Sequence, residues 1–188
     1  MKPNDVLLFA DATRLRLFPP LRATWARVGE PALVPVTGRN DRCVLFGTIN
    51  VRTGHRVAVR WPRETGPGAR ALLTEVRRRY RSASTIWLLL DRGPAHTAGP
   101  TQRLAQELGI TLVWLPKQWP ELNGMDQVWR ELKRLVAANR QAAHIDHLVQ
   151  QAEDWLFGLS PREALTKAGI RSPKFWLRSL RQYFCSDT

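Results

Sequence analysis

Continuous apolar runs predict several buried strands along the chain. Val6–Ala10 is closed by Asp11, Ile86–Leu90 is closed by Asp91, and Thr111–Leu115 is closed by Pro116. Such runs are typical of strands covered on both faces. Shorter stretches bounded by polar turns predict three further strands, whereas residues 14–28 read as irregular. These strands are Ala32–Val36, Cys43–Val51 and Arg56–Trp61, and their succession indicates an antiparallel meander.

Helical periodicity takes over after the meander. Apolar residues spaced three and four apart predict a series of helices, namely Ala69–Arg81, Thr101–Leu108, Asn123–Asn139, Ala142–Phe157 and Pro161–Ala168. Strands first, then alternating helix and strand, then helices, indicate the α/β class. We expect a mixed sheet, with an antiparallel meander plus parallel strands, and helices packed on it.

The net charge of the chain indicates which class of partner it binds. The 188 residues include 29 Lys and Arg against 16 Asp and Glu, which gives a formal net charge of +13. A balance this basic favours a polyanionic partner, of which nucleic acid is the commonest. A ribosome-associated or merely basic protein is the alternative.

Three other classes are excluded by simple counts. Apolar runs such as Ile86–Leu90 fall far short of the ~20 apolar residues of a membrane span. The N-terminal segment reads as a strand rather than a signal peptide. Cys43 and Cys185 are far apart and form neither a disulfide framework nor a zinc motif. The expected compartment is therefore the cytosol.

Two aspartates occupy the same kind of position in the sequence. Asp11 and Asp91 each follow a buried apolar run, and sites in open α/β sheets form beyond the carboxyl ends of parallel strands. If the two strands are neighbours, their ends lie ~4.8 Å apart. Such a pair favours a bound cation, and oxygen-only ligands suit Mg²⁺ or Mn²⁺. Alternatively each Asp simply opens a turn, as Asp91-Arg92-Gly93-Pro94 suggests.

A third carboxylate lies at the start of the strongest predicted helix. Asn123 fits the N-cap position, and Asp126 then follows in the first turn, where a capping role is the alternative to a functional one. On the helical wheel, Asp126 borders the core-facing arc, and a basic stripe of Arg130, Lys133 and Arg134 lies on its other side. A carboxylate followed by such a stripe suits a metal site next to a phosphate-binding face.

These residues carry a family resemblance. Residues 115–133 read Leu-Pro-Lys-Gln-Trp-Pro-Glu-Leu-Asn-Gly-Met-Asp-Gln-Val-Trp-Arg-Glu-Leu-Lys, and 34 residues separate Asp91 from Asp126. This segment resembles the Pro-Glu-Leu-Asn … Trp-x-x-Leu-Lys signature of the mariner superfamily of DDE/D transposases, especially its bacterial insertion-sequence 630 branch. The stretches at 91–96 and 24–31 resemble the family's second-aspartate motif and its Trp-x-x-x-Gly stretch.

The resemblance implies a ribonuclease H-like fold and a catalytic, metal-binding triad of Asp11, Asp91 and Asp126. It implies two Mg²⁺ or Mn²⁺ ions and a reaction that hydrolyses phosphodiesters and transfers strands at transposon ends. The chain departs from the family pattern at Ala12, Arg92, Gly124 and Asp126, where the bacterial branch commonly has Glu, Asn, Pro and Glu. Asp in the third place resembles the mariner branch.

The resemblance also implies partners and an organisation. We expect double-stranded DNA, both transposon ends and target, a homodimer on DNA, a bacterial, nucleoid-associated location and no membrane. Residues 1–160 are expected to form the catalytic domain and 161–188 a helical tail. The family's N-terminal helix-turn-helix domain is expected to be absent, so the chain is expected to be either a truncated or split transposase or a catalytic subunit with a separate N-terminal DNA-binding subunit. The expected DNA contacts are Arg77, Arg78, Arg92, His96, Lys117, Asn123, Arg130, Lys133 and Arg134.

Some residues keep two interpretations. Arg77 and Arg78 fit either DNA contact or a solvated helix face, and His96 fits either the site or a capping position. Trp114 favours core packing, whereas Trp119 fits an exposed ring that contacts DNA. Two alternative functions also stay open: a catalytically inactive DNA-binding remnant of a transposase, and a ribonuclease H-like nuclease such as a junction resolvase.

Overall fold

The computed structural model describes residues 4–31, 33–36, 38–117 and 119–177. The strands are β1 (Val6–Arg16), β2 (Arg42–Asn50), β3 (Arg56–Trp61), β4 (Ile86–Leu90) and β5 (Ile110–Trp114). The α-helices are α1 (Gly66–Arg79), α2 (Pro94–Thr97), α3 (Gly99–Glu107), α4 (Gly124–Leu132), α5 (Ile145–Gly158) and α6 (Pro161–Lys167). A 3₁₀ turn, η1 (Pro120–Leu122), precedes α4, and a π-helical turn, η2 (Lys133–Ala137), follows it.

The five strands form one mixed sheet in the order β3-β2-β1-β4-β5. β1, β2 and β3 make an antiparallel meander, and β4 and β5 add on in parallel beside β1. The mixed sheet expected from the sequence is confirmed. β1 is the central strand, and its pairing with β4 runs from Val6 with Ile86 to Phe9 with Leu89.

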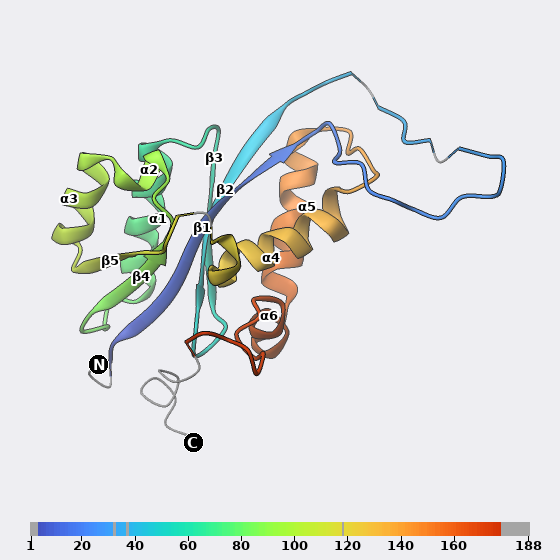
Figure 1. The fold of residues 1–188 in the computed structure, drawn as a ribbon. Helices are drawn as coiled ribbons and strands as arrows, with labels where there is room; N and C mark the ends of the chain where they lie inside the picture. Colours follow the sequence, from blue (N-terminus) through green and yellow to red (C-terminus); the bar gives the residue numbers. More distant parts are fainter. Residues whose placement is uncertain (1–3, 32, 37, 118, 178–188) are drawn as a thin grey trace.

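Helices cover both faces of the sheet (Figure 1). On one face α1, α2 and α3 enclose an apolar core with Leu8, Phe46 and Leu88. On the other face α4, α5 and α6 enclose a second core, in which Phe9 and Trp129 are fully buried. Consecutive residues of a strand point to opposite faces, so Asp11 shares the α4 face with Phe9.

The expected strand boundaries near the N-terminus are wrong in two places. β1 does not end before Asp11 but runs on to Arg16, and the buried Thr13 and Leu15 alternate with exposed arginines. This alternation is a strand pattern with basic residues on its open face. The predicted strand Ala32–Val36 is not a strand in its described residues, because it lies in a projecting loop whose prolines cannot donate a ladder hydrogen bond.

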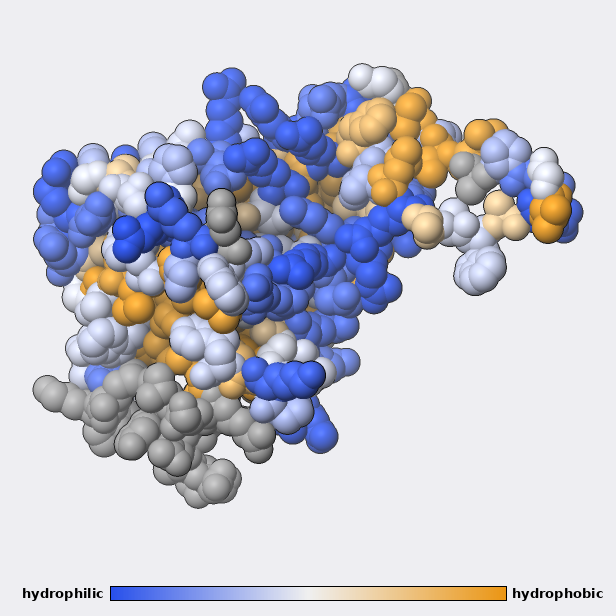
Figure 2. Space-filling model, in the orientation of Figure 1, coloured by the Kyte–Doolittle hydropathy of each residue, from blue (hydrophilic) through white to orange (hydrophobic). Residues whose placement is uncertain are grey.

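We call that loop, residues 18–40, the arm. Its base is closed by a hydrogen bond of 2.8 Å from the Leu17 N–H to the Asp41 carbonyl. Asn139 holds it a second time: its side chain accepts from the Arg22 N–H and donates to the Arg22 carbonyl, at 2.8 and 2.9 Å. Beyond this clasp the arm projects from the body with apolar side chains on its surface (Figure 2). Trp25 within it is fully exposed.

The remaining expectations agree more closely with the structure. The predicted helix Asn123–Asn139 begins as expected but passes into the π-helical turn after Leu132. α6 packs Ala164 and Leu165 into the core beside α4, and residues 178–188 of the predicted tail lie outside the described residues. No helix in the described part of the chain is long and apolar enough to span a membrane.

Candidate active site

The sheet opens between β1 and β4, and the first carboxylate lies there. The pairing of the two strands ends at Phe9 and Leu89, while β1 continues alongside β2 with Asp11 opposite Gly47. Desolvation by burial, the charges of Asp126 and Asp91, and a weaker effect of Glu64 raise the pKa of Asp11 to about 8, against a hydrogen bond from the Ala12 backbone. The position demands a cation or a proton to balance the carboxylate.

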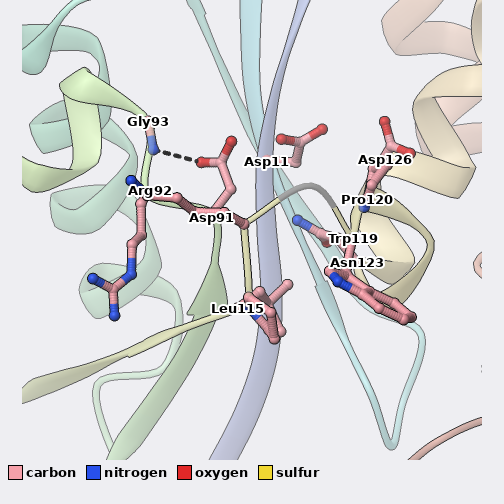
Figure 3. Close-up of a pocket in the computed structure, with 11 residues that line it drawn as sticks. Asp11, Asp91, Arg92, Gly93, Leu115, Trp119, Pro120, Asn123 and Asp126 are labelled. Carbon is pink, nitrogen blue, oxygen red and sulfur yellow. Dashed lines mark hydrogen bonds between the residues drawn. The ribbon is translucent and has the colours of Figure 1, made fainter.

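Asp91 follows the last residue of β4. Its Oδ1 accepts a hydrogen bond of 3.1 Å from the Gly93 N–H, which begins the turn into α2. The side chain is 60% exposed, and the buried His96 places its Nε2 3.8 Å from Oδ1. The turn expected at Asp91 therefore exists, and the second carboxylate oxygen points away from the hydrogen bond to Gly93 (Figure 3).

α4 brings the third carboxylate to the same place because two local features fix its start. The Asn123 side-chain oxygen caps the helix at the Met125 N–H (3.0 Å), and its Nδ2 donates to the Ala10 carbonyl of β1 (2.9 Å). Asn123 is only 3% exposed and acts as a tether between α4 and β1. Its side chain also lines the cavity described below, and the DNA contact expected of it stays a prediction.

Gly47 lets α4 approach the sheet. A Cβ atom at this position would lie 2.6 Å from Cζ2 of Trp129 and 2.9 Å from Cε of Met125. Because Gly47 is paired with Asp11 on the neighbouring strand, the close approach occurs where the first carboxylate lies. Asp126 consequently faces the same cavity as Asp11.

Asp126 is engaged by a cation from its own helix. Its Oδ2 accepts hydrogen bonds from Nε and Nη2 of Arg130, at 2.9 and 2.6 Å. The spacing of four residues places both side chains on one face of the helix. Asp126 therefore forms this ion pair instead of the capping box that was the alternative.

The three carboxylates line a cavity of about 390 Å³. Figure 3 shows them projecting from β1, from the end of β4 and from α4 around one space. Arg92 and Lys117 add two cations to the wall, and Trp119 adds an aromatic ring. The rest of the lining is Gly93, Leu115, Pro116, Pro120 and Asn123.

The chemistry of this donor set suits a hard divalent cation. All three groups offer carboxylate oxygens, the ligands of Mg²⁺ and Mn²⁺, and the raised pKa of Asp11 reflects negative charge that such a cation would balance. Among the described residues, no three Asp, Glu, His or Cys side chains are arranged to hold a metal ion as they stand. Asp126 would have to exchange Arg130 for the ion.

Lys133 lies beside the acidic cavity. Burial lowers its pKa, an effect opposed by the charges of Asp11 and Asp126. It also lines a neighbouring cavity of about 470 Å³ with Arg14 and Arg16 at the base of the arm. Of the expected basic residues, Arg92, Lys117, Arg130 and Lys133 are thus gathered around or beside the acidic cavity.

Three other expected DNA contacts lie elsewhere. The Arg77 guanidinium donates to the carbonyls of Tyr80, Arg81 and Ala83, and so ties the chain that follows α1. Arg78 pairs with Glu75 at 2.6 Å, and Arg134 pairs with Glu131 at 3.0 Å. None of these three arginines lines the acidic cavity.

Sequence reasoning missed one acidic group near the site. Glu64, in the connection between β3 and α1, contributes to the raised pKa of Asp11 and binds Arg14 of β1 at 2.8 Å. No motif surrounds it in the sequence, so only the fold brings it close.

Comparison with known proteins gives a consistent result. The family described as DDE superfamily endonuclease matches residues 6–149. An insertion element IS630 uncharacterized 39 kDa protein from Shigella sonnei is 24% identical over 156 residues, covering 82% of this chain. The chain spans only 46% of that relative's length.

Solved structures show the same fold. The mariner Mos1 paired-end complex with Mg superposes with a TM-score of 0.69 at 12% identity, over 94% of this chain and 55% of that one. The catalytic domain of Mos1 mariner transposase gives a TM-score of 0.63 at 10% identity, over 94% of this chain and 81% of that one. The expected ribonuclease H-like fold and the resemblance to IS630 and mariner proteins are confirmed.

Proposed function

The chain belongs to the DDE superfamily endonucleases, and we propose that it is the catalytic domain of a DNA transposase of the IS630 and mariner type. Its reaction would be the hydrolysis of phosphodiesters at transposon ends and the transfer of the freed strand to target DNA. The observation that carries the proposal is the convergence of Asp11, Asp91 and Asp126 on one cavity. The similarity to Mos1 transposase, solved as a paired-end complex with Mg, supports it.

Asp11, Asp91 and Asp126 are the proposed ligands of two Mg²⁺ or Mn²⁺ ions. Two divalent ions in such a site activate the attacking oxygen and stabilise the leaving oxygen of an in-line phosphoryl displacement. Asp11 would hold its charge only with a cation near it, because burial and its acidic neighbours raise its pKa. Asp126 would change partner from Arg130 to the ion.

The basic side chains have a second task. Arg92 and Lys117 line the cavity. Their positive charges would bind the DNA phosphates on either side of the cleaved bond. Arg130 of α4, once free of Asp126, and Lys133 at the start of η2 would extend this cationic surface. We propose that His96, which is buried beside Asp91, packs against that carboxylate rather than contacting DNA.

The proposed substrate is double-stranded DNA at the bacterial nucleoid. Contacts with phosphate fix the position of DNA but carry no sequence information, so we assign the choice of transposon ends to a separate DNA-binding part. We also propose that the chain acts as a homodimer on DNA. The exposed apolar side chains of the arm, Trp25, Val28 and Leu33, support a contact between copies.

The experiment is thermal unfolding with and without Mn²⁺, with and without duplex DNA. A ligand that binds only the folded state stabilises it by about 2.7 kcal/mol at a hundredfold excess over its Kd. We expect a rise in Tm for the native chain and none for Asp91→Asn. Glu107 lies at the end of α3 and does not line the cavity. The Tm of Glu107→Gln should therefore rise with Mn²⁺ as that of the native chain does.

The same samples separate the alternatives. An unchanged Tm in Mn²⁺ even with DNA present would overturn the proposal in favour of a non-catalytic DNA-binding remnant. Cleavage of linear duplex, RNA–DNA hybrid and four-way junction, compared side by side, distinguishes a transposase from a ribonuclease H or a resolvase. We expect cleavage of the linear duplex.

A further inference from the structure

Trp119 is an exposed aromatic ring in a charged cavity. It is 55% exposed and shares the cavity wall with the three carboxylates, Arg92 and Lys117 (Figure 3). Burying a Trp side chain normally stabilises a protein, so a large ring left open to solvent at a binding site is a ready contact surface.

The backbone holds Trp119 in place. Its carbonyl accepts a hydrogen bond of 3.1 Å from the Leu122 N–H, which closes the η1 turn. The same turn leads directly into Asn123, whose side chain is bonded both to β1 and to the start of α4. The position of Trp119 is therefore fixed relative to the elements that carry Asp11 and Asp126.

The ring has no structural task of the kind that Trp176 has. The Trp176 indole N–H donates to the Leu122 carbonyl at 2.9 Å, and its ring packs against Phe9 and Phe175. Within the part of the chain that the structure describes, Trp119 makes none of the ring contacts that hold Trp176. The exposed ring of Trp119 is therefore available to bind a ligand.

We propose that Trp119 is a stacking platform for an unpaired nucleobase of the DNA strand whose phosphate is bound by Arg92 and Lys117. This inference rests on the proposed function, since it takes the ligand of the cavity to be DNA. Arg92 and Lys117 bind the phosphate, and the ring of Trp119 then stacks on the base of the next nucleotide along the strand. A base that is still paired within the duplex does not offer its face to the ring.

Two consequences follow for the DNA that binds best. A base must leave the duplex stack to reach the ring, and this costs least at a frayed end, a mismatch or a single-stranded extension. Stacking also tolerates every base, because each has an aromatic face. The cavity should therefore prefer unpaired nucleotides beside the bound phosphate while showing little choice among the four bases.

The test is DNA binding by the full chain in EDTA, followed by fluorescence anisotropy. One probe is a duplex with a three-nucleotide single-stranded extension, and the other is the same duplex fully paired. Trp119→Ala removes the ring, Trp119→Phe keeps an aromatic face, and Phe157→Ala removes an exposed ring on α5 that does not line the cavity. A 2-aminopurine in the extension reports stacking through quenching of its fluorescence.

We expect Trp119→Ala to weaken binding of the extended DNA about fivefold to a hundredfold and binding of the paired duplex less than about twofold. Trp119→Phe should keep most of the preference, and Phe157→Ala all of it. The quenching of 2-aminopurine should be lost only in Trp119→Ala. Equal weakening of both probes, or no weakening, would overturn the inference. Because no metal is present, this outcome is independent of the Mn²⁺ test of the proposed function.

Discussion

Replacing Asp11 by Asn should make the metal-free protein more stable while removing its response to metal. The carboxylate lies on the α4 face of β1, where burial and the charges of Asp126 and Asp91 raise its pKa to about 8. Asparagine has nearly the same shape and carries no charge. The substitution therefore removes an electrostatic cost without opening a cavity in the core.

The magnitude follows from the shift in pKa. The ordinary value for this group is 3.8 and the folded value is about 8, and each pKa unit corresponds to ~1.4 kcal/mol. The shift of about four units thus sets an upper limit of roughly 6 kcal/mol. The cavity is open on one side, and water screens the charge there, so we expect a gain of about 2 kcal/mol at pH 8.

The sign of the pH dependence is equally specific. Between pH 4 and 8 the folded protein keeps a proton on Asp11 that the unfolded chain has released, so stability decreases as the pH rises through this window. The native chain should therefore lose stability relative to Asp11→Asn from about pH 4 upward, until the difference levels off near pH 8.

Urea unfolding in EDTA at several pH values measures this difference directly. Glu107→Gln serves as the control, since it removes a carboxylate outside the cavity and should leave the pH dependence unchanged. Addition of Mn²⁺ at pH 8 should stabilise the native chain and not Asp11→Asn. Parallel pH curves for the native chain and Asp11→Asn would show that burial and the neighbouring charges do not hold a proton on Asp11, and would refute the reasoning.

Three further substitutions test the packing that positions the site, each measured by urea unfolding. Gly47→Ala should lower the free energy of unfolding by about 1–3 kcal/mol, because its Cβ would lie 2.6 Å from the ring of Trp129. Gly158→Ala is the control, since a Cβ at Gly158 has nothing within 4 Å. Equal losses of stability in the two variants would contradict the prediction. Arg56→Met should cost about 1–3 kcal/mol, since its guanidinium binds three carbonyls at the end of α5. Ser160→Ala should cost about 1 kcal/mol by removing the capping box of α6, and no loss would contradict that role.

The sequence predicted the site where one local pattern determined it. Asp91 follows an apolar run, and the structure places it at the end of β4. Asn123 was recognised as a helix cap, and it caps α4. The core-facing residues of this helix, such as Val128, Trp129 and Leu132, are buried as their spacing predicts. In each case the determining interaction lies within one element.

Features that depend on two distant elements were not predictable in this way. Gly47 is one of twelve glycines, and only the packing of α4 on β2 shows that it admits the helix beside Asp11. The length of β1 was misjudged because Asp11 closes the apolar run and the residues from Arg14 onward read as irregular. The ion pair of Asp126 with Arg130 could have been inferred, since four residues separate them on a helix.

The arm gives the molecule a long reach from a fixed base. Between the clasp at Arg22 and the closing residue Asp41, its chain must go out and return, so at ~3.3 Å per residue its tip can stand at most about 30 Å from the body. That length is close to the diameter of a small domain. Its two anchors, at Asn139 and at the end of β1, fix the base from which the arm extends. At full extension the middle of the arm therefore reaches a surface about that far from the body, whereas Trp25, three residues beyond Arg22, reaches only ~10 Å from the clasp.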